Sequence, residues 1–346
     1  MPLLIEDYAL IGDCQTAALV GRDGSIDWLC LPRFDSAACF AALLGTPEHG
    51  RWRIAPAGEV TKITRRYRGD TLILETDMET EQGSIRVTDC MPVRCRESHS
   101  PHLVRSVTGL TGKVAVHSEL KIRFDYGNDI PWVRRLDDGS GISAIAGPDM
   151  IVLRADVPLE GKDHHTASDF SIRPGETVNF VMHWFPSYKQ PPAAIDAGEA
   201  ISDAEKFWQG WISVAKVEGR WAEAIKRSLI TLKALTHWET GGIVAAPTTS
   251  LPEQLGGPRN WDYRFCWLRD ATFTLQAMIG AGYHEEAAAW RSWLSRAIAG
   301  SPEEVQIMYG ISGERRLTEW EVDWLPGYEN SKPVRIGNGA ATQLQI

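Results

Sequence analysis

Short runs of alternating apolar and polar residues fill the first half of the chain, which is the pattern of half-buried β-strands. An Asp-Gly turn at residues 23–24 lies between the apolar runs 18–20 and 25–29 and predicts a hairpin. A second hairpin is predicted between residues 71–76 and 84–88, around the turn at 81–83. Further strands are predicted at residues 103–107, 114–124, 151–155 and 177–185. Many short strands separated by Gly and Pro turns predict an antiparallel β-sandwich over residues 1–190.

The strand predicted at residues 177–185 alternates most regularly. Its apolar side chains should face the core of the sandwich: Val178, Phe180, Met182 and Trp184. Asn179 and His183 should face the other way, toward solvent.

The apolar period becomes helical after the Pro-rich segment at residues 189–192. A connecting helix is predicted over residues 193–214, within a linker of residues 191–217. Further helices are predicted over residues 220–238, 270–281 and 284–299. Residues 218–346 are therefore predicted to form a helical domain, and its long irregular segments, 241–268 and 300–339, are of a length that usually carries function.

Charge narrows the range of partners. The 346-residue chain has 36 Lys and Arg against 45 Asp and Glu, a formal net charge of −9, and it contains no basic run. An acidic chain of this kind is poorly suited to bind nucleic acid or an anionic membrane. We therefore expect neither as a partner and leave the oligomeric state, including a homo-oligomer, open.

The six cysteines indicate a reducing compartment. They are Cys14, Cys30, Cys39, Cys90, Cys95 and Cys266. They form no Cys-x-x-Cys pair and are too sparse for a disulfide framework. The first residues lack the basic and apolar regions of a secretory leader, and no uncharged apolar run approaches the roughly 18 residues of a membrane span. The sequence thus predicts a cytoplasmic protein.

Metal and cofactor sites are not predicted. His164 and His165, or His99 and His102, lack the spacing of a zinc site. The sequence also lacks a phosphate-binding Gly-Lys-Ser/Thr loop and a Gly-x-Ser-x-Gly nucleophile motif.

Residues 247–270 are rich in aromatic, Arg and Asp side chains, which is chemistry suited to a sugar. Ten of the 14 tryptophans lie between Trp208 and Trp324. Pyranose rings have apolar faces that stack on aromatic rings, and their hydroxyls hydrogen-bond to planar groups such as guanidinium and carboxylate. Trp261, Tyr263, Trp267, Arg269 and Asp270 supply both kinds of group within ten residues. The alternative from these residues alone is a packed aromatic core with a structural Arg–Asp ion pair.

Three ordered sequence blocks resemble glycoside hydrolase family 15, the glucoamylase family. The first is Leu19 to Ser36, with its Asp-Gly-Ser-Ile-Asp-Trp-Leu-Cys run. The second is the aromatic stretch that ends in Trp267-Leu-Arg-Asp270, and the third runs from Arg315 to Asn338. Together they extend over nearly the whole chain.

The resemblance implies a fold and a set of substrate-binding residues. Bacterial members carry a β-sandwich before an (α/α)6 barrel, and the Trp-x-Arg-Asp motif opens an inner helix of that barrel. By motif match, Arg269 and Asp270 would hold the terminal glucose of the substrate, and Tyr263 and Trp267 would line the same subsite. The turn Arg33-Phe34-Asp35 would reach toward the barrel mouth.

The resemblance also implies an inverting glycosidase, in which one carboxylic acid protonates the leaving oxygen and one carboxylate activates water. In this family both are glutamates on loops of the later barrel, and no block of this chain matches them, so they are expected beyond Ile346. Glu319, Glu321 and Asp323 alternate and would share one side of a strand, but such a run is more often a solvated face.

A full barrel of twelve helices needs roughly 200 residues, more than follow residue 217, so the barrel is expected to be incomplete. The sequence therefore predicts a glucoamylase-like enzyme that releases glucose from the non-reducing end of α-glucosides. A trehalase of the same family, and a sugar-binding chain without catalysis, remain the alternatives. The linkage that is cut is left open.

Overall fold

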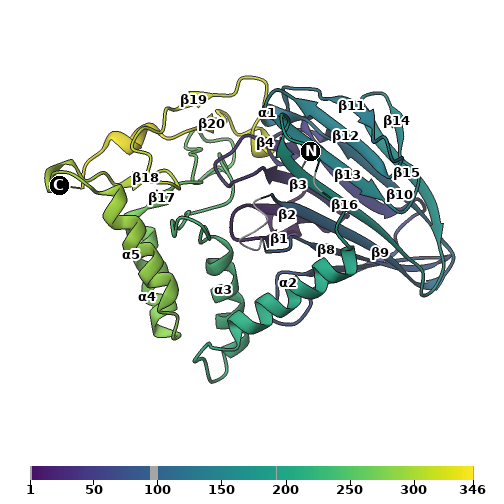
Figure 1. Ribbon diagram of the computed structural model, residues 1–346, viewed down its shortest axis with the longest axis horizontal. Coiled ribbons are helices and arrows are strands. Elements are labelled where there is room, and N and C mark those ends of the chain that lie inside the picture. The colour runs from purple at the N-terminus through teal and green to yellow at the C-terminus, as the bar shows by residue number, and fades with distance from the viewer. Residues whose placement is uncertain (1, 94–99, 192, 346) are drawn as a thin grey trace. The chain divides into compact units, whose positions relative to one another are not determined.

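A computed structural model describes residues 2–93, 100–191 and 193–345, so Cys95 and His99 lie outside the described residues (Figure 1). The chain divides into two compact units. The first unit comprises Met1–Asp13, Ala18–Pro32 and Ala37–Phe207. The second comprises Cys14–Ala17, Arg33–Ser36 and Trp208–Ile346. Two short segments from the N-terminal region therefore belong to the second unit.

The first unit is built from two eight-stranded antiparallel sheets, which confirms the predicted β-sandwich. One sheet has the order β1-β2-β3-β5-β10-β15-β14, with β4 paired to β3. Its strands are β1 (Tyr8–Gly12), β2 (Ala17–Gly21), β3 (Ser25–Cys30), β4 (Ala38–Phe40), β5 (Arg51–Pro56), β10 (Val114–Lys121), β14 (Glu160–Lys162) and β15 (His165–Ile172).

The second sheet has the order β11-β12-β13-β16-β9-β8-β7-β6. Its strands are β6 (Lys62–Tyr67), β7 (Leu74–Thr80), β8 (Gly83–Cys90), β9 (His102–Gly112), β11 (Trp132–Arg135), β12 (Gly141–Ala146), β13 (Asp149–Ala155) and β16 (Thr177–Pro186).

Both predicted hairpins are present. Strands β2 and β3 pair with Ala18 opposite Leu29, and β7 and β8 pair with Thr80 opposite Gly83. Gly24 in the first turn has a φ of 83°, and a Cβ there would lie 2.1 Å from the carbonyl oxygen of Ile54. Only glycine fits that turn without strain.

The core of the sandwich consists of apolar side chains from both sheets. Examples are Val20, Ile26 and Trp52 from one sheet and Val87 and Phe180 from the other, all fully buried. The remaining short elements of this unit are η1 (Ile5–Asp7), η2 (Ala42–Leu44), η3 (Pro47–His49) and the turn α1 (Phe124–Gly127).

The outer face of the second sheet is also partly covered. Helix α2 (Ala197–Ile212) packs Ala197, Ile201 and Ala204 onto Ile73 and Val104. The alternation predicted along β16 fails at His183, which was expected toward solvent but is buried, with its ring 3.8 Å from that of His102 and 5.8 Å from that of Phe185.

The second unit contains α3 (Ala222–Ala234), α4 (Leu268–Gly280) and α5 (Glu285–Ala297), close to the helices predicted from the apolar period. In Figure 1, α4 and α5 run side by side as a helical hairpin. The long segments between the helices contain two short two-stranded pairs, β17 (Cys266–Trp267) with β18 (Met308–Tyr309) and β19 (Trp320–Glu321) with β20 (Arg335–Ile336). They also contain η4 (Pro302–Glu304), η5 (Tyr328–Asn330) and η6 (Gly339–Thr342).

A buried ion pair joins the helices of this unit. The Lys233 ammonium on α3 lies 3.0 Å from the Glu286 carboxylate on α5. The Trp211 indole N–H donates a 2.7 Å hydrogen bond to the same carboxylate oxygen, and the Trp211 ring stacks on Tyr283 at 4.1 Å. Burial acts to raise the pKa of Glu286, but Lys233 and the hydrogen bond from Trp211 outweigh it and hold that pKa below its usual value.

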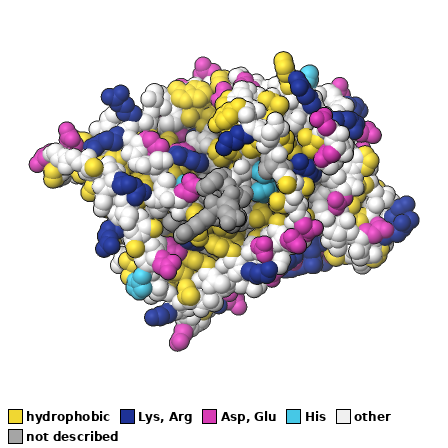
Figure 2. All heavy atoms as spheres, in the orientation of Figure 1, with side chains coloured by type: hydrophobic (Ala, Val, Ile, Leu, Met, Phe, Trp, Pro, Cys, Tyr) yellow, Lys and Arg dark blue, Asp and Glu magenta, His cyan; other side chains and the backbone are white. Residues whose placement is uncertain are grey.

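Charges of both signs are interspersed over the face drawn in Figure 2, with no extended single-sign patch on it. Among the described residues, no helix is long and apolar enough to cross a membrane.

Candidate functional site

The aromatic segment singled out in the sequence leads directly into α4. Cys266 and Trp267 form β17, whose partner β18 pairs Trp267 with Met308, and the helix begins at Leu268. Asp270 is therefore the third residue of the helix and not its N-cap, which is Trp267. Its carboxylate lies in the first turn, where the helix dipole favours a negative charge.

The two aromatic residues predicted for the site lie against each other. The Tyr263 and Trp267 rings have centroids 5.4 Å apart at an interplanar angle of 36°. Trp267 is buried in a small apolar cluster with Phe265, Met308 and Ala341, and Tyr263 packs on that cluster while half-exposed.

The two charged residues predicted for the site form an exposed ion pair. Nε and Nη2 of Arg269 both donate to Oδ2 of Asp270, at 3.2 and 3.0 Å. The side chains are 71% and 40% exposed. An exposed pair of this kind contributes little to stability, generally less than about 1 kcal/mol.

The charges of Arg269 and Asp270 act on Tyr263. The pKa of the Tyr263 hydroxyl is raised, first by partial burial and then by the negative charge of Glu253. Arg269 lowers and Asp270 raises the same pKa, so both charges act at the Tyr263 ring. The arrangement presents an aromatic surface next to a guanidinium and a carboxylate, which is the chemistry that a sugar ring needs.

A buried ion pair that the sequence analysis did not identify holds the backbone around Tyr263. The Asp262 and Arg264 side chains are fully buried, and Nη2 of Arg264 lies 2.7 Å from Oδ2 of Asp262. The same carboxylate oxygen accepts the Gly337 amide at 3.1 Å, and the Asn338 side-chain amide donates to the Asp262 carbonyl at 3.0 Å. The Asp-Tyr-Arg order was the available signal, because residues i and i+2 of an extended segment share a side.

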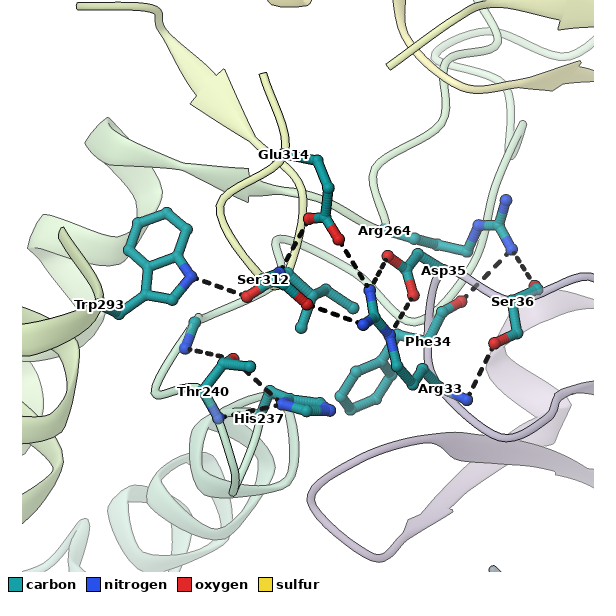
Figure 3. Close-up of polar contacts among 12 residues, drawn as sticks. Arg33, Phe34, Asp35, Ser36, His237, Thr240, Arg264, Trp293, Ser312 and Glu314 are labelled. Atoms are coloured by element: carbon teal, nitrogen blue, oxygen red, sulfur yellow. Dashed lines mark hydrogen bonds and ion pairs between the residues drawn. The ribbon is translucent and has the colours of Figure 1, made fainter. Parts of the chain in front are cut away.

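Figure 3 shows how the Arg33–Ser36 segment joins this unit. Arg264 donates to the carbonyl oxygens of Phe34 and Ser36, at 3.3 and 2.8 Å. Arg33 forms two hydrogen bonds with Asp35 and a 2.8 Å hydrogen bond with the hydroxyl of Ser312. The turn predicted to reach the barrel mouth is thus fixed within the helical unit by Arg264 and Ser312.

The alternating carboxylates at the start of β19 interact with a cation. Glu319 and Glu321 both face Arg335, at 3.5 and 3.6 Å, as their alternation predicts. The Arg335 guanidinium lies 4.5 Å from the centre of the Trp261 ring, and Oε2 of Glu319 accepts the Gly339 amide at 2.9 Å. A shared cation offsets the repulsion between these two carboxylates.

Within the described ranges, no group of three or more His, Cys, Asp and Glu side chains is placed to hold a metal ion.

Two family models match the chain. The model "Trehalase-like, N-terminal" matches residues 2–178, and "Glycosyl hydrolases family 15" matches residues 219–346. A trehalase from Mycolicibacterium smegmatis is 34% identical over 99% of this chain and 55% of that protein. A trehalase from Thermoplasma volcanium is 30% identical, again over 99% of this chain and 55% of its own length. The chain thus spans about half the length of these relatives.

A solved structure agrees with the fold. A bacterial glucoamylase complexed with acarbose superposes with a TM-score of 0.63, over 89% of this chain and 52% of that chain. The two sequences are 12% identical, so the superposition speaks for the architecture alone.

Proposed function

This chain belongs to glycosyl hydrolases family 15 and carries a trehalase-like N-terminal domain, and from that premise we propose that its helical unit binds the terminal glucose of an α-glucoside. Arg269 and Asp270 would hydrogen-bond the glucose hydroxyls, and Tyr263 and Trp267 would form the aromatic wall. The observation that carries the proposal is the exposed Arg269–Asp270 pair at the start of α4, beside the packed Tyr263 and Trp267 rings.

Trehalose is the substrate that we favour. The sequence alone favours a glucoamylase-like activity, with trehalase as the alternative. Relatives that match almost the whole chain at 30–34% identity are named trehalases, which reverses that order. A 1,4-linked α-glucan is the second candidate.

The reaction that we propose is inverting hydrolysis by a complete family 15 protein. An acid protonates the leaving oxygen, and a base on the opposite face activates water. We assign substrate binding, and neither of these two roles, to residues of this chain. A chain that binds sugar without cleaving it is the alternative outcome.

The architecture that goes with this proposal is a sandwich within residues 1–190, apart from the segments 14–17 and 33–36 that belong to the helical unit, a linker of residues 191–217 and the first part of an (α/α)6 barrel in residues 218–346. A cytoplasmic location is also proposed. The buried free thiols Cys14, Cys30, Cys39, Cys90 and Cys266 support it.

Asp270→Asn tests the site. We expect the affinity for methyl α-glucoside, measured by calorimetry, to fall about tenfold, because the amide keeps the shape but loses the charged acceptor. Stability should change by less than about 0.5 kcal/mol, as for other exposed positions. Asp203→Asn is the matched control, since Asp203 forms an exposed pair with Lys206 on α2, and it should leave the affinity unchanged.

Unchanged affinity in Asp270→Asn would refute the site. Glucose release from trehalose, maltose, maltotriose and isomaltose then identifies the substrate. Binding without release from any of the four would favour the sugar-binding alternative.

A further inference from the structure

One open edge of the sandwich contains two cavities. This edge is formed by β11 and β14, each of which is the terminal strand of one of the two sheets (Figure 1). The volumes of the cavities are about 260 and 410 Å³. All of the residues that line them belong to the first unit, so neither cavity is part of the proposed glucose site.

The lining residues show that the two cavities are neighbours. Val133 lines the smaller cavity and Arg135 the larger one, and residues i and i+2 of a strand lie on the same side of it. The segment that leads into β14 contributes Gly161 to the smaller cavity and Leu159 to the larger one. Nη2 of Arg135 donates a 3.3 Å hydrogen bond to the carbonyl oxygen of Leu159. The cavities therefore form one groove, the edge groove, which Arg135 crosses between them.

The smaller cavity combines aliphatic and polar walls. Ile130 and Val133 contribute to the aliphatic wall and are 52% and 49% exposed. Lys162, Asp163 and His164 contribute exposed polar side chains. Aliphatic groups in contact with water favour a ligand with an apolar face, and the polar wall favours a ligand that also forms hydrogen bonds.

The charges in the edge groove favour a neutral ligand. Lys162 and Asp163 line the smaller cavity, and Arg135 and Asp156 line the larger one, so each cavity has one cation and one carboxylate. Balanced charges attract an ion weakly, but they supply both donors and acceptors to hydroxyl groups, which can act as either. A pyranose ring carries such hydroxyls together with an apolar face. The edge groove therefore suits a neutral sugar better than an organic anion.

A buried arginine holds the polar wall in place. Asp163 and His164 form the two-residue turn between β14 and β15, with φ values of 44° and 59°. Arg123 is buried, and its Nη1 donates a 3.0 Å hydrogen bond to the carbonyl oxygen of His164. Positive φ at both residues is the conformation that fits the twist of a tight hairpin. The wall is thus preorganised, which reduces the entropy lost when a ligand binds.

We propose that the edge groove is a second carbohydrate site, which binds two adjacent rings of a neutral oligosaccharide, one in each cavity. The smaller cavity lies just below the range of small-molecule sites, about 300–1,000 Å³, so a single ring matches it better than a larger group. The site retains a sugar chain, and no cleavage step is assigned to it. The choice of an α-glucan as the oligosaccharide rests on the proposed function, whereas the site itself rests on the sandwich alone.

Hydrogen–deuterium exchange on the full chain locates the site. The probes are maltotetraose and methyl α-glucoside, each added to the wild type and to Asp270→Asn. At about ten times its Kd, maltotetraose should slow exchange in residues 130–135 and 159–166 by about tenfold, because it binds only the closed form of these segments. The slowing should be the same in both proteins, since Asp270 belongs to the other unit. Methyl α-glucoside has one ring and should protect these residues less.

Val133→Arg tests the edge groove, and Trp132→Arg is its matched control. Both positions are exposed on β11, so both variants should fold, but neighbouring residues of a strand face opposite sides and only Val133 lines the groove. In the Asp270→Asn background, we expect Val133→Arg to lower the calorimetric affinity for maltotetraose about tenfold, which is about 1.4 kcal/mol. Trp132→Arg should leave that affinity within about twofold of its starting value.

Three results would overturn the second site. They are unchanged exchange in residues 130–135 and 159–166 with maltotetraose, equal affinities in Val133→Arg and Trp132→Arg, and protection of the groove by sodium acetate but not by sugar, which would indicate an anion site.

The two proposals fail separately. If Asp270→Asn lowers the affinity for methyl α-glucoside and no sugar protects the groove, the glucose site stands and the second site falls. If maltotetraose protects the groove while Asp270→Asn binds methyl α-glucoside as the wild type does, the second site stands and the proposed function fails.

Discussion

The sandwich and the helical unit each bury an arginine–aspartate ion pair, and the two pairs have different tasks. Arg105 lies 2.7 Å from Asp89, and Arg264 lies 2.7 Å from Asp262, with all four side chains at most 1% exposed. Each guanidinium also donates to two carbonyl oxygens, those of Trp52 and Gly24 for Arg105. The chemistry is the same, but the surrounding backbone is not.

In the sandwich, Asp89 and Arg105 lie directly opposite each other on β8 and β9. The sheet already satisfies the backbone groups there, so the pair adds to a structure that is fixed by its ladder. In the helical unit the pair lies in a segment where isolated main-chain hydrogen bonds, such as Ala246 to Tyr263 and Ser250 to Trp261, take the place of a continuous ladder. Side chains satisfy further backbone groups, since Asn338 donates to the Asp262 carbonyl and Arg264 to that of Ser36. The irregular segment thus depends more on individual side chains than the sheet does, because the sheet distributes its hydrogen bonds over many residues.

Asp89→Ala and Asp262→Ala give the largest expected effect. Each leaves a buried guanidinium without its partner, so we expect a loss of about 3–5 kcal/mol in the free energy of unfolding, measured with denaturant. At a temperature where both variants are folded, Asp262→Ala should also weaken methyl α-glucoside binding, because Tyr263 loses its support. Asp89→Ala should bind as the wild type does. Equal sugar affinities in the two variants would refute the claim that only the Asp262–Arg264 pair supports sugar binding.

Glu286→Gln should have a smaller effect that depends on pH. At pH 7 we expect a loss of about 2–3 kcal/mol, because Lys233 loses its charged acceptor but keeps the rings of Trp211 and Trp238, at 5.8 and 5.1 Å. The folded-state pKa of Glu286 is lowered, so its stabilising contribution is present above the usual value of 4.5 and is lost as pH falls below it.

Unfolding free energies measured from pH 7 down to pH 3 check this sign. The wild type should lose the advantage over Glu286→Gln across the acid range. A constant difference between the two proteins at every pH would contradict the ion pair.

Arg86→Ala should have the smallest effect. Arg86 forms two hydrogen bonds with Asp77 on the outer face of β7 and β8, at 2.7 and 3.0 Å, and the two side chains are 29% and 18% exposed. A surface pair in a complete ladder should contribute no more than about 1 kcal/mol, and added salt should reduce that further. Denaturant titration at low and high salt measures both. A loss as large as that of Asp89→Ala would show that the sheet is less robust than its ladder suggests.

The sequence predicted those features of the fold that depend on the local pattern of apolar and turn residues. The hairpins, the sandwich and helices α3, α4 and α5 follow from apolar period and turn residues, and the structure confirms them. Tyr263 and Trp267 were predicted to share a site, and the structure packs them together, while their role in binding stays a prediction.

The remainder depends on residues far apart in the sequence. His183 was expected toward solvent but is buried, with its ring against those of His102 and Phe185. The link between Arg264 and the carbonyls of Phe34 and Ser36 spans more than two hundred residues. No local period encodes such a contact, and an arginine within an aromatic run gave no sign of its partner.

The helical unit takes its residues from three separate stretches of the chain, two of which lie among the first forty residues. No single cut in the chain therefore separates the two units completely. A recombination event at any point between residues 37 and 207 would combine a helical half from one parent with the segments 14–17 and 33–36 from another. Chimeras between distant relatives should tolerate exchange of the sandwich only when those two segments are kept with their own helices.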